Sequence, residues 1–503
     1  MSTREIPAAV DHRLHPWSWL FVLLQQLRQF LLPLVALVVF GNRGDRDEFI
    51  GHLITLGVVV ALVGTAVLQY LTYRYRIGSD GLSIRSGILA RNRREIPFAR
   101  IHNVTVHQNV LHRLFGVAEL RLESAGGDKP EAQMRVLRLD QALALEQLIR
   151  HRGHAPQATP DAIPEAAPAP DVLLALPAGE LVRLGLVSNR ALVVLAAAFG
   201  ASYQMFPRQV VEGFIEQQGR QVFGYASGLQ LGSWTTAATV AVVLVFALAV
   251  MRLLSIGLAL LQYHDFRLSE GDGRLTIERG LLTRVRASAA PRRIQAWTLR
   301  EGLLHRLFER RSLRIDIASG SPQDEHGRAL KELVPIGRPE ACDALINHVL
   351  PTVQWPPMQW QPVVTSSWWR LCLPALLLVL LASGLACVNL GAWGLLPLLW
   401  LPWSAFKARR QVLRMGWSVD GHCVALRGGW WNRWWRMAEL DKLQALQLRR
   451  SPLDRWLGTA TLTLDTAGAG AGPALQLQFL PEAEARAVVA RLSRALARRK
   501  LRW

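Results

Sequence analysis

Residues 73–127 read YRYRIGSDGLSIRSGILARNRREIPFARIHNVTVHQNVLHRLFGVAELRLESAGG, and the chain repeats the pattern of this stretch twice more. The second copy lies within residues 263–320 and the third within residues 414–468. The same spacing of 14 residues separates a glycine from an apolar anchor in every copy: Gly87 and Ile101, Gly280 and Ile294, Gly429 and Leu443. Ten residues after each anchor comes LHRLF, LHRLF or LDRWL. Three copies in one register indicate a common fold.

Each copy has the pattern of a small antiparallel β-domain closed by a helix. Tyr73, Tyr75 and Ile77 alternate with polar residues, as strands with one buried face do, and glycine-containing turns follow. A helical segment with Pro or an acid in its first turn ends each copy. We therefore predict three β-domains with a C-terminal helix, at residues 73–153, 263–350 and 412–503.

Apolar segments precede every copy. A helix needs about 20 apolar residues to cross a bilayer, and six stretches approach that length. They are residues 17–40, 50–71, 187–206, 234–261, 368–387 and 390–406. Residues 17–29 contain Arg28 and three glutamines, so they fit either a span or an amphipathic helix in the membrane plane. The fold class predicted is membrane α-helical plus β.

The predicted organisation is three tandem units, each a transmembrane helix pair followed by a β-domain. The helix pairs occupy residues 1–72, 177–262 and 368–411. Linkers rich in proline fill residues 154–176 and 351–367. The segments after each pair are strongly basic, whereas the loops within the pairs, 41–49, 207–233 and 388–389, carry no positive excess. Because basic flanks stay in the cytoplasm, we expect both termini and all three β-domains there, at a bacterial inner membrane.

The repeats also resemble a known family. The Gly followed by two apolar residues (GIL, GLL, GWW), the L(H/D)R(L/W)(F/L) element and the L-x-(L/I) strand resemble the bacterial pleckstrin-homology-like (PH-like) membrane proteins, in particular the YdbT-like members with three such domains. The resemblance implies a partly open barrel of seven strands, plugged at one end by a helix. It also implies a role in envelope stress or in resistance to antimicrobial peptides.

Composition argues against catalysis and against specific nucleic-acid binding. No GxSxG, GxxxxGK(S/T), HExxH or paired-cysteine motif occurs, and the four cysteines have no metal-ligand spacing. Of the 58 basic residues 53 are Arg, as a GC-rich genome produces, so the net charge of +20 is weak evidence for an anion site. His102, His107 and His112 share no face of a strand or helix. We expect no enzyme activity, metal, cofactor or nucleic-acid partner.

The LHRLF element indicates packing more than chemistry, because the third copy has Asp454 where the others have His112 and His305. We expect this element to form a short helical turn under the barrel. Leu114, Leu307 and Trp456 occupy one place in the three copies. If they are buried there, alanine at any of them should destabilise its domain by about 2–5 kcal/mol.

The strongest functional signal is the set of basic and aromatic residues beside the membrane. Anionic headgroups attract each nearby Arg, and Trp prefers the interface. Four Trp lie within six positions of the third copy, so some must be exposed and available to the bilayer or a sister domain. The candidate contacts are Arg91, Arg93, Arg94, Arg284, Arg286, Arg292, Arg293, Trp430, Trp431, Arg433, Trp434, Trp435 and Arg436.

Two functions fit these features. The first is a binding or scaffold module whose partners are membrane lipids and either a second copy or another membrane protein. The alternative is a transporter or flippase-like component for a peptide or lipid, which should carry charged or broken spans at corresponding positions of its repeats. The intramembrane residues Arg28 and Arg252 do not correspond, and the third pair has neither, which favours the scaffold.

Overall fold

Four antiparallel sheets carry most of the chain that the structure describes. The computed structural model describes residues 11–13, 16–24 without 22, part of 57–72, 73–124 without 79, 80 and 88–91, 132–152, 171–205, part of 209–221, 233–317, 330–466 and 475–498. The predicted loop 41–49 and most of the first helix pair therefore lie outside the described residues. So do Arg28 and Arg91.

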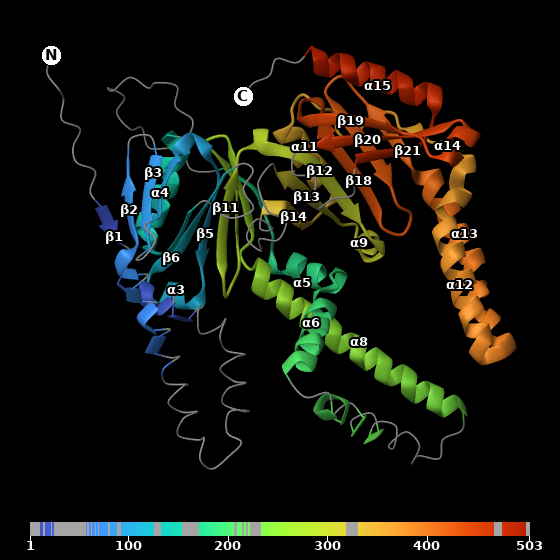
Figure 1. Cartoon of the computed structure of the whole chain (residues 1–503), viewed down its shortest axis with the longest axis horizontal. Helices are drawn as coiled ribbons and strands as arrows, with labels where there is room; N and C mark the ends of the chain where they lie inside the picture. Colours follow the sequence, from blue (N-terminus) through green and yellow to red (C-terminus); the bar gives the residue numbers. More distant parts are fainter. Residues whose placement is uncertain are drawn as a thin grey trace. The chain divides into compact units, whose positions relative to one another are not determined.

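The first sheet has four strands in chain order. They are β1 (Asp11–Arg13), β2 (Arg74–Ile77), β3 (Gly81–Ser86) and β4 (Asn92–Pro97). Their period-2 alternation buries Tyr75, Leu82 and Ile96 on one face. This face packs on strands β5 to β7 and on the helix α4 (Leu139–Arg152), where Val104, Leu120 and Leu145 complete one core (Figure 1).

The second sheet crosses the boundary between the first and second copies. Its order is β7-β6-β5-β11-β10-β9-β8. The first copy supplies β5 (Ile101–Gln108), β6 (Val117–Ser124) and β7 (Ala132–Arg138). The second copy supplies β9 (Arg267–Gly271), β10 (Arg274–Arg279) and β11 (Arg284–Ala289), and the segment before it supplies β8 (Asp171–Ala175). Strand β11 pairs antiparallel with β5, so the two copies share one sheet.

The third sheet repeats this arrangement between the second and third copies, with the order β14-β13-β12-β18-β17-β16-β15. Its strands are β12 (Ile294–Glu301), β13 (Arg311–Ile317), β14 (Glu332–Gly337), β15 (Gln361–Pro362), β16 (Gly416–Val419), β17 (Cys423–Gly428) and β18 (Arg433–Glu439). The fourth sheet holds β19 (Leu443–Arg449), β20 (Thr459–Thr466) and β21 (Leu475–Pro481).

Each copy of the repeat includes a short strand that lies before its β-domain in the sequence. A short strand precedes the apolar stretches of each copy and joins the sheet that follows them: β1 pairs with β2, β8 with β9, and β15 with β16. Residues 171–175 and 361–362 lie within the predicted linkers 154–176 and 351–367 but form strands, and neither stretch is long enough to show a clear alternation in the sequence. Hydrogen bonding to a neighbouring strand nevertheless makes these two stretches β-strands.

The three C-terminal helices expected from the sequence are present as α4, α11 (Pro339–Val349) and α15 (Glu482–Ala497). In the third copy, Ala485, Val488 and Leu492 of α15 pack on Leu462 and Leu477 of the fourth sheet. The chain divides into two compact units. The first is residues 1–271 with 276–288, and the second is residues 272–275 with 289–503.

Two described helical segments are long and apolar enough to cross a membrane, Ala238–Tyr263 and Thr365–Arg414. The first belongs to α8 (Ser233–Tyr263). A third candidate is the pair α5 (Ala178–Val187) and α6 (Arg190–Met205), bent by 57° at the break between them. Helix α5 packs closely on α8, since a Cβ at Gly185 would lie 2.4 Å from the Cα of Ile256.

The segment Thr365–Arg414 turns back on itself. It comprises η3 (Thr365–Leu371), α12 (Leu373–Leu390), η4 (Gly391–Leu399) and α13 (Trp400–Arg414). Gly391 has a φ of 56°, a conformation that favours glycine, and beyond it η4 packs against α12. A Cβ at Gly394 would lie 2.3 Å from the backbone N of Cys387, so only glycine permits this contact.

Candidate membrane-docking surface

Three short helices present large apolar side chains to the outside. They are α3 (Val110–Leu114), α9 (Leu303–Leu307) and α14 (Pro452–Leu457), formed by the LHRLF, LHRLF and LDRWL elements. Leu114, Leu307 and Trp456 are 76%, 74% and 78% exposed. The expectation that these side chains are buried is therefore wrong, because a single helical turn on a domain surface buries only one of its faces. Their equivalent exposure in three copies indicates an interaction surface.

In the first and third short helices the buried residue is the variable second residue of the element, whereas His305 of the second is half-buried. His112 is buried, with its ring centroid 4.3 Å from that of Phe21, in the first apolar segment. Asp454 is buried at the N-terminus of α14, where its carboxylate is 2.8 Å from Arg370, in the turn that enters α12. In these two copies the short helix therefore packs against the start of the apolar stretch that precedes its domain.

Asp454 makes an unusually complete set of contacts. It accepts hydrogen bonds from the Ser451 backbone N–H and hydroxyl and from the Thr459 hydroxyl, while the Asp454 N–H donates to Ser451. Burial by itself raises the pKa of Asp454, but these hydrogen bonds and the one from Arg370 lower it to about 2. The third short helix is thus held by a capping box and an ion pair.

An arginine in each of the first two short helices binds the hairpin tip of the next copy. Arg113 Nη1 donates to the Leu281 carbonyl at 2.8 Å, and Arg306 Nη2 donates to the Trp431 carbonyl at 2.9 Å. Leu281 and Leu282 are exposed at the first tip, and Trp431 at the second. We call each short helix with the tip bound to it an apolar patch: Leu111, Leu114, Leu281 and Leu282 in one, Leu303, Leu307 and Trp431 in the other.

The four Trp side chains of the third-copy hairpin lie in different surroundings. Trp430 and Trp431 form the tip, and the Trp430 ring lies 5.3 Å from Phe406 and 6.1 Å from Trp403 on α13. A groove of about 780 Å³ lies between α13 and the tip, with Lys407 on its wall. Trp434 packs toward the core, and Trp435 stacks under Arg311. Indoles and a lysine at the end of an apolar helix suit the headgroup layer.

Most of the predicted basic contacts are paired within the protein. Arg93 is exposed and 2.6 Å from Glu95. Arg284 lies 3.3 Å from Glu278, and Arg286 lies 3.5 Å from Glu146 on α4. Arg94 and Arg292 are exposed. The pKa of Arg293 is lowered by burial and by neighbouring Arg292. These side chains therefore stabilise strand pairs as well as carrying charge.

Arg433 and Arg436 lie on β18, where the third copy joins the second. Arg433 is 3.2 Å from Glu301. Arg436 is 1% exposed, 2.6 Å from Asp316, and donates to the Thr298 hydroxyl at 3.2 Å. A side chain so buried does not reach a headgroup, so Arg436 joins two copies of the repeat. Alternation along the strand accounts for this placement, because Arg433 and Arg436 fall on opposite faces.

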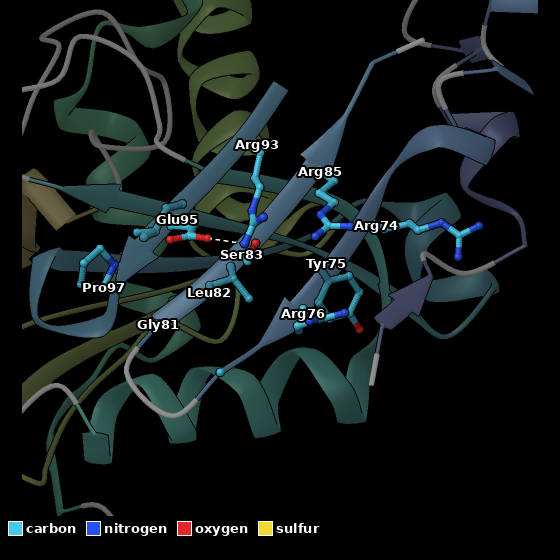
Figure 2. Close-up of a pocket in the computed structure, with 12 residues that line it drawn as sticks. Arg74, Tyr75, Arg76, Gly81, Leu82, Ser83, Arg85, Arg93, Glu95 and Pro97 are labelled. Carbon is cyan, nitrogen blue, oxygen red and sulfur yellow. Dashed lines mark hydrogen bonds and ion pairs between the residues drawn. The ribbon is translucent and has the colours of Figure 1, made fainter. Parts of the chain in front are cut away.

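The outer face of the first sheet carries a row of arginines. The strand register places Arg74 opposite Arg85 and Arg85 opposite Arg93, while Ser83 lies opposite Glu95. Figure 2 shows Arg74, Arg85 and Arg93 on three neighbouring strands and the ion pair from Arg93 to Glu95. They line a shallow cavity of about 350 Å³. Like charges directly opposite one another are destabilising, and the Glu95 carboxylate offsets this repulsion at Arg93.

The Arg252 guanidinium has hydrogen-bond partners within the helical region. Its Nη1 donates to the Ser188 carbonyl at 3.3 Å and to Asn189 Oδ1 at 3.2 Å, at the break between α5 and α6. The Ser255 hydroxyl also donates to the Ser188 carbonyl. These contacts pair the carbonyl that the bend releases, which is how broken membrane helices are tolerated. The counterpart prediction, Arg28, lies outside the described residues.

The described residues contain no group of three or more His, Cys, Asp or Glu side chains that could hold a metal ion. Burial raises the pKa of Cys342 and of Cys423 to about 12, so neither thiol ionises near neutral pH. Burial also lowers the pKa of His305.

Comparison with known proteins bears on the repeats. The family described as "Bacterial PH domain" matches residues 22–153, 192–349 and 371–496, which include the apolar segments as well as the β-domains. The transmembrane protein YdbT of Bacillus subtilis (strain 168) is 21% identical over 461 residues, covering 87% of this chain and 89% of that protein. No solved structure matches the chain significantly.

Proposed function

Because this chain belongs to the bacterial PH domain family and is a membrane protein, we propose that its three PH-like domains form a binding scaffold docked on the cytoplasmic face of a bacterial inner membrane. Each domain follows a helix pair, and both termini lie in the cytoplasm. The scaffold binds lipid headgroups and protein partners and carries out no chemistry of its own.

One observation carries the proposal: the same position of the repeat exposes Leu114, Leu307 and Trp456. Two of the short helices that carry them pack on the start of an apolar helix pair, through Phe21 and Arg370. When an exposed Leu or Trp beside the start of an apolar stretch enters the bilayer interface, the free energy falls by about 25 cal/mol per Å² of apolar surface removed from water. The basic flanks add attraction to anionic lipids.

A depth measurement tests this docking. With the four native cysteines replaced by alanine, Leu114, Leu307 and Trp456 are each changed to Cys, spin-labelled and placed in anionic liposomes. We expect all three labels to meet oxygen more readily than a polar nickel reagent, because oxygen concentrates in lipid. A label at Glu484, exposed on α15, is the control and should show the reverse preference. Labels at the short helices that behave like the one at Glu484 would exclude bilayer docking.

Topology is tested separately. Reporter fusions after residues 160 and 355, at the two junctions between units, should be active only as cytoplasmic reporters, because basic flanks are retained on that side. Alkaline phosphatase activity at either junction would contradict the arrangement.

The transporter alternative has one observation in its favour, the 57° break beside Arg252. Transporters use such breaks to line a substrate site. Here Arg252 donates hydrogen bonds to Ser188 and Asn189. In addition, residues 371–406 of the third pair contain no charged side chain. A repeated transport site therefore has no counterpart in the third unit, and the scaffold is better supported.

A further inference from the structure

The two ends of the repeat array have matching strand edges. In the first junction β11 lies against β5, with Arg286 opposite Val106. In the second β18 lies against β12, with Trp435 opposite Leu299. These are the same positions of the repeat, so both junctions use one register.

Strand β4 is the first-copy equivalent of β11 and β18, and β19 is the third-copy equivalent of β5 and β12. Among the strands that the structure describes, none pairs with the outer side of β4 or of β19, since each ends its sheet. From this geometry we propose that β19 of one chain pairs with β4 of a second chain, in the register of the internal junctions, to give a head-to-tail assembly in the membrane. The inference rests on the proposed function only in placing all domains on one side of the bilayer.

Burial along the equivalent strands supports the pairing. Every described side chain of β5 is buried, as are seven of the eight in β12. In β19, by contrast, Gln444, Ala445, Gln447 and Arg449 are exposed. The first four residues of β4 are exposed as well. A partner strand would bury β19 as it buries β5 and β12.

The charges match too. Across the second junction, Arg436 of the third copy pairs with Asp316 of the second. Counted from the repeat glycines, Arg436 corresponds to Arg94, and by sheet register Asp316 corresponds to Asp465. Arg94 and Asp465 are both exposed. The proposed register brings these two residues of different chains together in the geometry of the buried Arg436–Asp316 pair.

Two further features fit the same junction. Arg455 is the equivalent of Arg113 and Arg306, which bind the hairpin tip of the next copy, and it is exposed. Arg93 on the outer face of the first sheet is exposed, whereas its second-copy equivalent, Arg286, lies 3.5 Å from Glu146 of the preceding α4. Such a contact uses two different surfaces, so it continues from chain to chain.

The test is disulfide cross-linking of two differently tagged full-length chains, co-expressed without native cysteines. One carries Arg93→Cys and the other Leu448→Cys. The equivalent internal pair, Val106→Cys with Arg286→Cys in one chain, is the positive control. Gln447→Cys replaces Leu448→Cys as the register control, because a shift of one residue moves the thiol to the opposite face of the sheet. We expect several-fold more cross-linked dimer from the 93–448 pair than from the 93–447 pair.

A charge exchange completes the test. Arg94→Glu in the first chain should reduce the 93–448 cross-link several-fold, and Asp465→Arg in the second chain should restore it. The proposal is overturned if the internal pair closes while the 93–448 pair does not, or if both inter-chain pairs react equally. A chain that docks its labels in the bilayer but does not cross-link rejects the strand pairing alone.

Discussion

Replacing Asp316 by alanine is expected to destabilise the junction between the second and third copies by about 3–5 kcal/mol. Arg436 is 1% exposed and 2.6 Å from Asp316, so the variant leaves a buried guanidinium whose one remaining hydrogen-bond partner among the described residues is the Thr298 hydroxyl. Such a charge is costly because the protein interior does not replace the water it has lost. The second compact unit should therefore open at β12 and β18.

Hydrogen exchange of the β12 and β18 amides in detergent measures this effect locally, which matters because a chain of several domains does not unfold in one step. Protection should fall by about a hundredfold or more, since 1.4 kcal/mol corresponds to a factor of ten. Arg433→Ala is the matched control on the same strand: Arg433 is one-third exposed and the buried Glu301 keeps Arg311 as a partner at 2.9 Å, so the loss should stay below about 1 kcal/mol.

A double variant, Asp316→Leu with Arg436→Met, separates the ion pair from the packing. Replacing both members of a buried pair by apolar residues is often neutral, so protection should largely return. If Asp316→Ala alone leaves exchange unchanged, the ion pair is not what joins the two copies.

Much of the local fold could be predicted from the sequence. The period-2 alternation of Tyr73, Tyr75 and Ile77 predicted β2, and the first-turn acids and proline predicted the three C-terminal helices. The family resemblance is confirmed by the match to the bacterial PH domain. These features depend on neighbours in the chain, which the sequence displays directly.

The junctions between copies could not be predicted in this way. Strand β11 pairs with β5 across more than 150 residues of chain, and no spacing or periodicity in either strand records that contact. The short strands β8 and β15 likewise depend on hydrogen bonds to a strand distant in the sequence, β9 and β16 respectively. A signal was nonetheless present: Arg286, Arg433 and Arg436 occupy strand positions, where a charge needs a partner.

The short helices show the opposite limitation. A large apolar residue at the same position in three copies suggested a core position, but residue type does not distinguish a side chain buried in protein from one placed against lipid. Leu114 and Trp456 are exposed in a protein that also has apolar helices. The substitution of Asp454 for histidine was the better clue, since it reflects the arginine at position 370.

Asp454→Ala is accordingly expected to cost the third domain about 3–5 kcal/mol, the second large effect, because Arg370 loses its buried partner and α14 loses its cap. Asp454→Asn keeps most of the hydrogen-bonding shape but not the charge, so its loss should be nearer 2 kcal/mol. Hydrogen exchange of the α14 and β20 amides in detergent gives both values. Equal protection in all three proteins would show that the carboxylate does not hold the helix.

The pH dependence gives an independent check. The pKa of Asp454 falls from 3.8 in the unfolded chain to about 2 in the folded protein, so the folded state binds the proton more weakly. The stabilisation is therefore complete above about pH 4 and is lost as the pH falls through 2. Around neutral pH, the natural protein should be better protected than Asp454→Asn by an amount that does not change with pH. As the pH falls from about 4 to about 2, this difference should disappear. A gap that persists at pH 2 would mean that Asp454 acts through shape and not through its charge.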